Sequence, residues 1–210
     1  RWLDFQPLEL DFAGLTAEAK RQLRLEADYE QEARHAERYR ELLGDTREFV
    51  VPRVHRDLST RRILALDFIE GLPLERLQDP DVPQRERDRV GRALEALMFR
   101  ELFGMRYMQT DPNPANYLYQ PATGKVALLD FGSTLELEPA RVERYRGICR
   151  ALLEDDEAAI RRYAVALGYL AADEPEPRAS GVIEMIRLVC EPLTHRGRYD
   201  FAGSRLVARA

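Results

Sequence analysis

The spacing of the apolar residues changes along this 210-residue chain, and that change constrains the fold more than any other feature. Before Gly44 and after Pro139 the apolar residues recur at steps of three and four, which is typical of amphipathic helices. Between these regions lie short runs rich in Val, Ile, Leu and Phe, separated by Pro and Gly, which indicate strands and turns. The sequence therefore predicts an α+β arrangement in which helices are in the majority.

The individual elements follow from the same patterns. Thr16 is expected to cap the first helix and Gly44 to end it. A polar turn separates the first two predicted strands, and a proline-bearing acidic link divides two of the last helices. The predicted elements are helices over 16–44 and 84–103, strands at 49–53 and 61–68, a hairpin over 117–129, and helices from 139 to the end of the chain with a link at 173–177.

Composition excludes several classes of protein. The chain carries 32 basic and 37 acidic residues, a net charge of −5, whereas a dedicated nucleic-acid binder is normally basic. Its cysteines, Cys149 and Cys190, cannot form a disulfide framework, which favours a reducing, cytoplasmic compartment. Since no apolar run approaches the roughly 18–20 residues of a spanning helix, the sequence predicts no membrane crossing by these residues.

Acidic and amide side chains are spaced in a distinctive way around a proline-containing loop. Asn116 follows Asp111 by five residues, and Asp130 begins an Asp–Phe–Gly tripeptide 14 residues later, after the predicted hairpin. This spacing resembles that of protein-kinase-like phosphotransferases. Carboxylate and amide oxygens are the ligands that Mg²⁺ prefers. We therefore expect Asp111 to orient or deprotonate an attacking hydroxyl, and Asn116 and Asp130 to bind Mg²⁺ that bridges nucleotide phosphates.

A second segment, His55–Arg56–Asp57, spells the usual kinase catalytic-loop tripeptide. The residue five positions after Asp57 is Arg62, however, which cannot bind a cation. We interpret this segment as a turn between strands. His35 and His195 have no second metal ligand at a suitable spacing, and both are predicted to be surface or helix-terminal residues.

Three motifs together resemble the UbiB family of atypical protein-kinase-like proteins, also called the AarF-domain kinases. Gln109 and Thr110, which stand where ordinary kinases have His and Arg, are specific to this family. The resemblance covers most of residues 5–200. Its motifs are 26–33, with Glu-Ala-Asp-Tyr followed by Glu-Ala, then 109–113 together with Asn116, and 126–132.

The resemblance implies a protein-kinase-like fold that binds ATP and Mg²⁺. Glu26 and Asp28 would belong to the family's Glu-x-Asp motif on the counterpart of the kinase αC helix, where they engage an N-terminal extension. Glu32 would pair with the nucleotide-binding lysine. The segment 66–72, with Asp67 and Ile69, would form the hinge that contacts adenine.

The expected domain organisation follows from this resemblance. Residues 1–72 would be a partial N-terminal lobe with the αC-like helix, two strands and the hinge, and residues 73–210 a helical C-terminal lobe. The family's glycine- or alanine-rich loop, its nucleotide-binding lysine and its Lys-x-Gly-Gln signature are missing, and neither Lys20 nor Lys125 can replace that lysine by position. We therefore expect a fragment or truncated product that lacks most of the N-terminal lobe.

Three functions remain open at this stage. The first is a UbiB-like kinase or ATPase in ubiquinone or other isoprenoid-lipid metabolism, with an isoprenoid lipid or ubiquinone-biosynthesis proteins as partners and peripheral contact with a membrane. The second is a catalytically inactive binding or scaffold module, which the missing lysine favours. The third is an aminoglycoside- or choline-kinase-like enzyme, although that class usually has a histidine where Gln109 stands.

Overall fold

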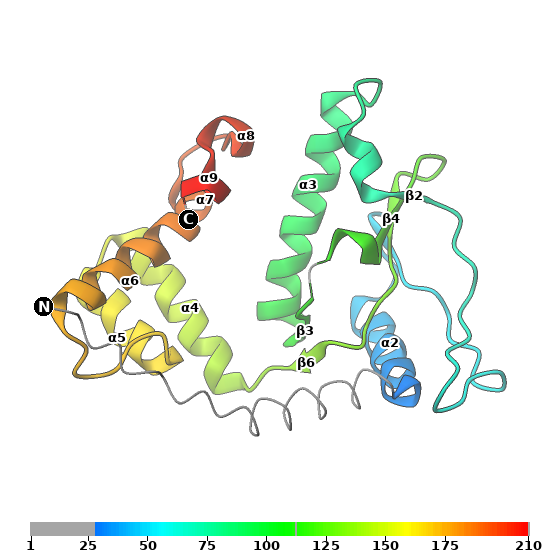
Figure 1. Cartoon of the computed structure of the whole chain (residues 1–210), viewed down its shortest axis with the longest axis horizontal. Coiled ribbons are helices and arrows are strands. Elements are labelled where there is room, and N and C mark those ends of the chain that lie inside the picture. Colours follow the sequence, from blue (N-terminus) through cyan, green and yellow to red (C-terminus); the bar gives the residue numbers. More distant parts are fainter. Residues whose placement is uncertain (1–27, 112, 210) are drawn as a thin grey trace, which may run out of the picture. The chain divides into compact units, whose positions relative to one another are not determined.

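The chain divides into two compact units in the computed structural model, which describes residues 28–111 and 113–209 (Figure 1). The first unit comprises the described residues up to Glu101 together with Tyr107–Leu135. The second comprises Leu102–Arg106 and the described residues from Glu136 onward. The expected lobe boundary after residue 72 falls inside the first unit and stays a prediction.

The first unit is built on a small sheet with helices beside it. The sheet has the strand order β1-β5-β4-β2; β1 runs parallel to β5, and the other neighbours are antiparallel. Two further strands, β3 and β6, pair with each other. The elements are α2 (Tyr29–Leu43), β1 (Phe49–Val50), β2 (Leu72–Pro73), the 3₁₀ helix η1 (Leu74–Gln78), α3 (Gln84–Phe99), the π-helix η2 (Arg100–Met105), β3 (Tyr107–Gln109), the 3₁₀ helix η3 (Pro114–Asn116), β4 (Tyr117–Gln120), β5 (Lys125–Leu128) and β6 (Thr134–Glu136).

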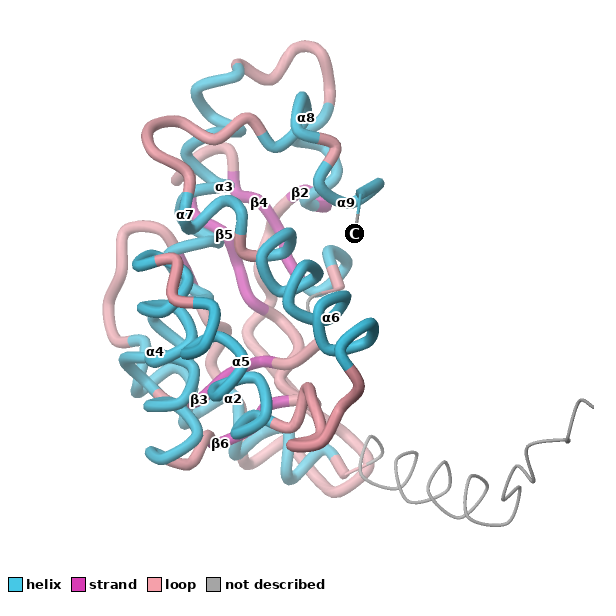
Figure 2. The backbone as a smooth tube through the Cα atoms, turned by 90° about the vertical axis from the view of Figure 1, so that its left-hand side faces the viewer, coloured by secondary structure: helices cyan, strands magenta, loops and turns pink. Residues whose placement is uncertain are grey.

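The predicted hairpin is confirmed. Strands β4 and β5 pair in register from Tyr117 opposite Leu128 to Gln120 opposite Lys125, and they lie side by side in Figure 2. Gly124 closes the turn with a φ of +72°, and its N–H donates to the Gln120 carbonyl at 2.7 Å. A left-handed φ favours glycine because it has no Cβ.

The first predicted helix begins later than its pattern suggested. Asp28 is not helical; its side chain caps α2 by accepting a hydrogen bond from the Gln31 N–H at 3.3 Å. A single helix over 16–44 is therefore wrong, because this cap starts a helix at Tyr29. Thr16 lies outside the described residues. The predicted end is confirmed, since Gly44 has a φ of +60° and its N–H donates to the Arg40 carbonyl.

The predicted strand at 61–68 is wrong. In the part of the chain that the structure describes, this segment forms isolated bridges, Val54 with Leu66 and Thr60 with Ile63, and no ladder. Its apolar side chains are not those of a buried strand, because Phe68 is 92% exposed. The strand expected at 49–53 is shortened to β1, which pairs with β5 of the hairpin.

The second predicted helix is confirmed, and it ends in a way the sequence did not indicate. It is regular as α3 up to Phe99 and continues as the π-helix η2 to Met105. In this wider turn Glu101 is buried. A π-helix is rare and is frequently found at functional sites.

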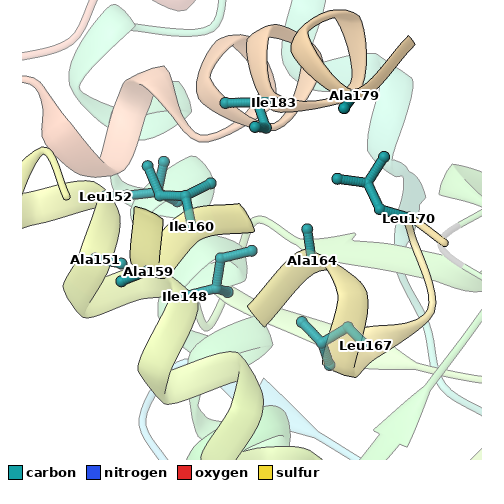
Figure 3. Close-up of a cluster of buried hydrophobic side chains, with 10 residues drawn as sticks. All are labelled: Ile148, Ala151, Leu152, Ala159, Ile160, Ala164, Leu167, Leu170, Ala179 and Ile183. Atoms are coloured by element: carbon teal, nitrogen blue, oxygen red, sulfur yellow. The ribbon is translucent and has the colours of Figure 1, made fainter. Parts of the chain in front are cut away.

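The second unit is helical, as predicted beyond Pro139. Side chains from α4, α5, α6 and the link before α6 gather into one apolar core, shown in Figure 3. No helix within the described ranges combines the length and the apolar character needed to cross a lipid bilayer. The helices are α4 (Pro139–Glu154), α5 (Glu157–Leu167), α6 (Glu176–Val189), α7 (Glu191–Thr194), α8 (Phe201–Ser204) and α9 (Leu206–Arg209).

Candidate functional site

The loop that carries Asp111 is held at both of its ends. At its start, the backbone N–H and the hydroxyl of Thr110 both donate to the Ser133 carbonyl, at 3.0 and 2.6 Å. At its end, the Asn113 side chain caps the short helix η3 by accepting from the Ala115 N–H at 3.0 Å. Asp111 itself is exposed. Asp111 therefore lies exposed directly after an anchored residue, Thr110.

Asn116 and Asp130, the predicted metal ligands, lie together. The Leu129 N–H donates to the Asn116 carbonyl at 3.0 Å, and both predicted ligands line one small cavity with Gln109 and Tyr117. The Asn116 Nδ2 atom is buried and has no hydrogen-bond partner. A buried amide without a partner is uncommon, and it indicates a group that is available to a ligand.

Asp130 follows β5 and faces a second carboxylate. Its Oδ1 atom accepts from the Gly132 N–H at 2.9 Å. A Cβ at Gly132 would lie 3.4 Å from that oxygen and 3.9 Å from Oε2 of Glu32. The carboxylates of Asp130 and Glu32, which are far apart in the sequence, thus both lie beside Gly132 of the Asp–Phe–Gly turn.

Glu32 lies on α2, on the face turned towards this turn. Burial raises the pKa of Glu32, the nearby Asp130 carboxylate raises it further, and a backbone hydrogen bond from Phe131 lowers it. A second carboxylate nearby disfavours the charged form of Glu32, and a cation bound beside the pair would relieve this repulsion. The predicted role of Glu32 as the partner of a lysine stays a prediction, because Lys125 donates to the Thr46 carbonyl at 2.9 Å and Lys20 lies outside the described residues.

The donor set fits Mg²⁺ bound together with a nucleotide. Among the described residues, no cluster of three or more His, Cys, Asp and Glu side chains could hold a metal alone. Mg²⁺ typically takes one or two protein oxygens and completes its shell with phosphates and water. Asp130 and Asn116 supply oxygens of that kind, and the Asn116 Nδ2 atom, which has no partner, is a donor suited to an acceptor such as a phosphate oxygen.

The remaining predicted nucleotide contacts are not gathered at this turn. Glu26 lies outside the described residues, and Asp28 is the N-terminal cap of α2. Asp67 points towards the 53–57 turn, where its carboxylate is 2.8 Å from His55 Nε2 and its N–H donates to the Arg53 carbonyl at 2.9 Å. The bond with His55 lowers the pKa of Asp67.

Ile69 is half-buried, just before β2. The segment His55–Asp57 forms the expected turn, which the Leu58 N–H closes by donating to the His55 carbonyl at 3.1 Å. The adenine-contact roles of Asp67 and Ile69 stay predictions.

A larger cavity, of about 910 Å³, lies elsewhere in the first unit. It lies between the C-terminal half of α2, the segment 44–57 and Lys125, and its lining includes neither Asp111, Asn116 nor Asp130. Charges of both signs surround it, so its size alone does not indicate a ligand.

Two residues on α2 were not recognised from the sequence as part of the site. His35 was expected at the surface, but it is half-buried; its Nδ1 is hydrogen-bonded with the Tyr107 hydroxyl at 2.5 Å. Burial lowers the pKa of His35. Tyr39 is 1% exposed, and its hydroxyl donates to Glu101 at 2.7 Å. With Glu32, these residues recur at steps of three and four, which places them on one face of α2.

Glu101 was also missed, although the sequence carries a signal for it. It follows Leu97 by four residues and Val90 by eleven, so it continues the buried face of α3. A carboxylate on an apolar stripe is rarely buried without a specific partner. Its partners are Tyr39 and the Gln109 N–H.

Comparison with known proteins shows the family of this chain. The model of the family described as ABC1 atypical kinase-like domain matches residues 1–164. The atypical kinase COQ8B, mitochondrial, of Danio rerio is 34% identical over 190 residues, which are 90% of this chain and 30% of that protein. The atypical kinase COQ8, mitochondrial, of Schizosaccharomyces pombe is 32% identical over 205 residues, which are 97% of this chain and 33% of that protein.

More distant relatives show the same relationship. The AarF domain-containing protein kinase 1 of Xenopus tropicalis is 31% identical over 76% of the chain and 31% of that protein. The solved structure of Rv3197 from Mycobacterium tuberculosis, in complex with erythromycin, superposes with a TM-score of 0.70 at 22% identity, over 89% of this chain and 46% of that one. That likeness shows the kinase-like fold. The chain spans about a third of the length of these curated relatives, and it belongs to the ABC1 atypical kinase-like family, also known as the UbiB or AarF family.

Proposed function

We propose that this domain binds Mg–ATP, with Asn116 and Asp130 as the protein ligands of the metal and Asp111 as the catalytic-loop carboxylate. One observation carries the proposal. Asn116 and Asp130 line the same cavity, and the N–H of Leu129, the residue before Asp130, donates to the Asn116 backbone carbonyl at 3.0 Å.

The residues then divide the chemistry between them. Bound Mg²⁺ would neutralise phosphate charge as it develops. Asn116 and Asp130 would hold the ion, and Glu32 would add negative charge beside it. Asp111, exposed on its anchored loop, would accept the proton of an attacking hydroxyl or water. Because family membership supports an atypical kinase, we assign the complete protein to ATP-dependent phosphoryl transfer or ATP hydrolysis.

The pathway belongs to the same proposal. The resemblance to the UbiB family supports a role in ubiquinone or other isoprenoid-lipid metabolism, with peripheral contact at a membrane surface. Two of the relatives are named mitochondrial proteins, COQ8B of Danio rerio and COQ8 of Schizosaccharomyces pombe. The chemistry of the site supports nucleotide binding and does not depend on this assignment.

A second function is favoured by one observation, and the same experiment separates the two. Lys125 is held by the Thr46 carbonyl at 2.9 Å, away from Glu32, so the described residues place no lysine beside that carboxylate. A scaffold module without nucleotide affinity would show this arrangement.

Isothermal titration calorimetry of the 210-residue chain with ATP, in the presence and absence of Mg²⁺, tests the proposal. We expect Mg-dependent binding that Asp130→Asn or Asn116→Ala weakens by at least roughly tenfold, the equivalent of about 1.4 kcal/mol. Asp88→Asn is the matched control, because Asp88 is an exposed aspartate on α3 that contacts Gln84. A folded chain that binds no Mg–ATP would support the scaffold function instead.

A further inference from the structure

Glu101 is the buried charged side chain of the described residues, with 6% of its surface exposed. Its Oε1 atom accepts two hydrogen bonds, from the Tyr39 hydroxyl at 2.7 Å and from the Gln109 N–H at 3.2 Å. Tyr39 belongs to α2 and Gln109 to β3, which leads directly into the Asp111 loop. One carboxylate oxygen therefore joins a helix of the first unit to the start of the catalytic loop.

The hydrogen bonds continue from Gln109 to the predicted metal ligand. The Gln109 Nε2 atom donates to the Asp130 carbonyl at 3.2 Å, and its Oε1 atom accepts from the Tyr117 hydroxyl at 3.1 Å. The amide of Gln109 is thus oriented at both ends, with its oxygen towards β4 and its nitrogen towards Asp130. This leaves a single arrangement of the side chain that satisfies both partners.

Packing follows the same route as the hydrogen bonds. The Tyr39 ring lies against the ring of Phe131, with centroids 4.9 Å apart and a tilt of 50°. Phe131, the middle residue of Asp–Phe–Gly, is 1% exposed. A displacement of Tyr39 would therefore disturb both its hydrogen bond to Glu101 and the packing of Phe131.

The buried carboxylate is not the residue that stability alone would favour. Burial raises the pKa of Glu101, which means that its charged form is poorly solvated there. Desolvated carboxylates are costly, and apolar side chains of similar size can often replace buried charged groups. The π-helix that begins at Arg100 is also less favourable than a regular helix. Both features occur where the chain turns from α3 towards the catalytic loop.

We propose that Glu101 and Tyr39 are positioning residues, which act through Gln109 to hold the Asp111 loop and the backbone of Asp130 in register with α2. The inference rests on the proposed function, since it names how that site is kept in shape. Neither residue contacts the nucleotide in this account. Their effect on binding passes through the backbone of Gln109 and its side-chain bond to the Asp130 carbonyl.

The chain offers a matched pair of tyrosines for the test. Tyr119 is 8% exposed, and its hydroxyl donates to Glu86 at 2.6 Å, between β4 and α3. Tyr39→Phe and Tyr119→Phe therefore each remove one hydroxyl bonded to one carboxylate, with the ring retained. Thermal unfolding reports whether the two changes cost similar stability. If they do, any difference between the two variants in Mg–ATP affinity or in amide shifts reflects where the lost hydrogen bond lies, and not merely the loss of a hydrogen bond.

Two readouts distinguish positioning from a merely structural role. In calorimetry with Mg–ATP, we expect Tyr39→Phe to weaken binding roughly three- to tenfold and Tyr119→Phe to change it by less than about twofold, within the range of coupling through packed networks. In ¹H–¹⁵N NMR spectra without nucleotide, we expect Tyr39→Phe to shift the amides of Gln109, Asp111 and Asp130. Tyr119→Phe should leave those three amides unchanged.

The outcomes separate this inference from the proposed function. If the wild-type chain binds no Mg–ATP, the proposed function fails, and the amide shifts alone decide whether the connection from Tyr39 to Asp130 exists. If the shifts caused by Tyr39→Phe stop at α2 and Glu101, the connection is refuted whatever the nucleotide does. Equal losses of Mg–ATP affinity in the two variants would also overturn it.

Discussion

Replacing Gly71 by alanine tests how closely the segment before β2 packs on the hairpin. A Cβ at this position would lie 2.8 Å from the Leu118 Cβ and 3.2 Å from the Tyr119 carbonyl oxygen. Carbon atoms in contact are normally about 3.5–4.0 Å apart, so the backbone would have to move by most of an ångström. Overpacking of this kind costs about 1–3 kcal/mol. At about 2–4 °C per kcal/mol, the melting temperature should fall by about 2–12 °C.

Gly91→Ala is the matched control, and it should act in the opposite direction. Gly91 lies in α3, and a Cβ there meets nothing within 4 Å. Alanine in a helix is favoured over glycine by about 0.5–1 kcal/mol, so this variant should melt higher than the wild type. Circular dichroism at 222 nm with heating gives both values. A Gly71→Ala variant as stable as the wild type, or a Gly91→Ala variant that melts lower, would refute the packing argument.

Three further predictions concern charge and core packing. Burial raises the pKa of Glu101. The stabilising contribution of the protonated side chain is therefore present below about pH 4.5 and is lost as the pH rises through the folded pKa. Between pH 4 and pH 8, the melting temperature of Glu101→Gln should rise relative to that of the wild type. Hydrogen bonds, first from Arg89, lower the pKa of Glu86 to about 2, so its stabilising contribution is lost between pH 4.5 and pH 2, and wild type should lose more stability over this range than Glu86→Gln does. Ile160→Ala, at a 0% exposed core position, should cost about 2–5 kcal/mol in urea unfolding, and Leu153→Ala, at 66% exposure, about 0.5 kcal/mol or less.

The elements that were predicted correctly are those whose signals are local. The hairpin has a turn residue, Gly124, at the position that needs a left-handed φ, and its strands pair with each other. The helices beyond Pro139 bury one regular apolar face against their neighbours. The segment 61–68 has the same apolar composition as a strand, but whether such a run forms a ladder depends on a distant partner. Its intended partner, β1, pairs with β5 instead.

The same distinction holds for the site. The spacing of Asp111, Asn116 and Asp130 is a local pattern that predicts a loop followed by a hairpin. In the structure, Asn116 and Asp130 line one cavity. The contact of Tyr39 with Glu101 joins residues 62 apart in the sequence, and no local pattern indicates it. The sequence shows only that Glu101 is a carboxylate on the apolar face of a helix. It does not indicate which residues form hydrogen bonds with this carboxylate.

The most direct test of the metal site uses Mn²⁺ in place of Mg²⁺, since both favour carboxylate and carbonyl oxygens. Added with ATP to the ¹⁵N-labelled chain, this paramagnetic ion broadens the amide signals nearest to it. The account predicts that Asn116, Asp130 and Gly132 broaden first, and that Asp130→Asn abolishes the effect. Broadening that begins instead around Asp67 and His55, or that persists unchanged in Asp130→Asn, would contradict the assignment of the site.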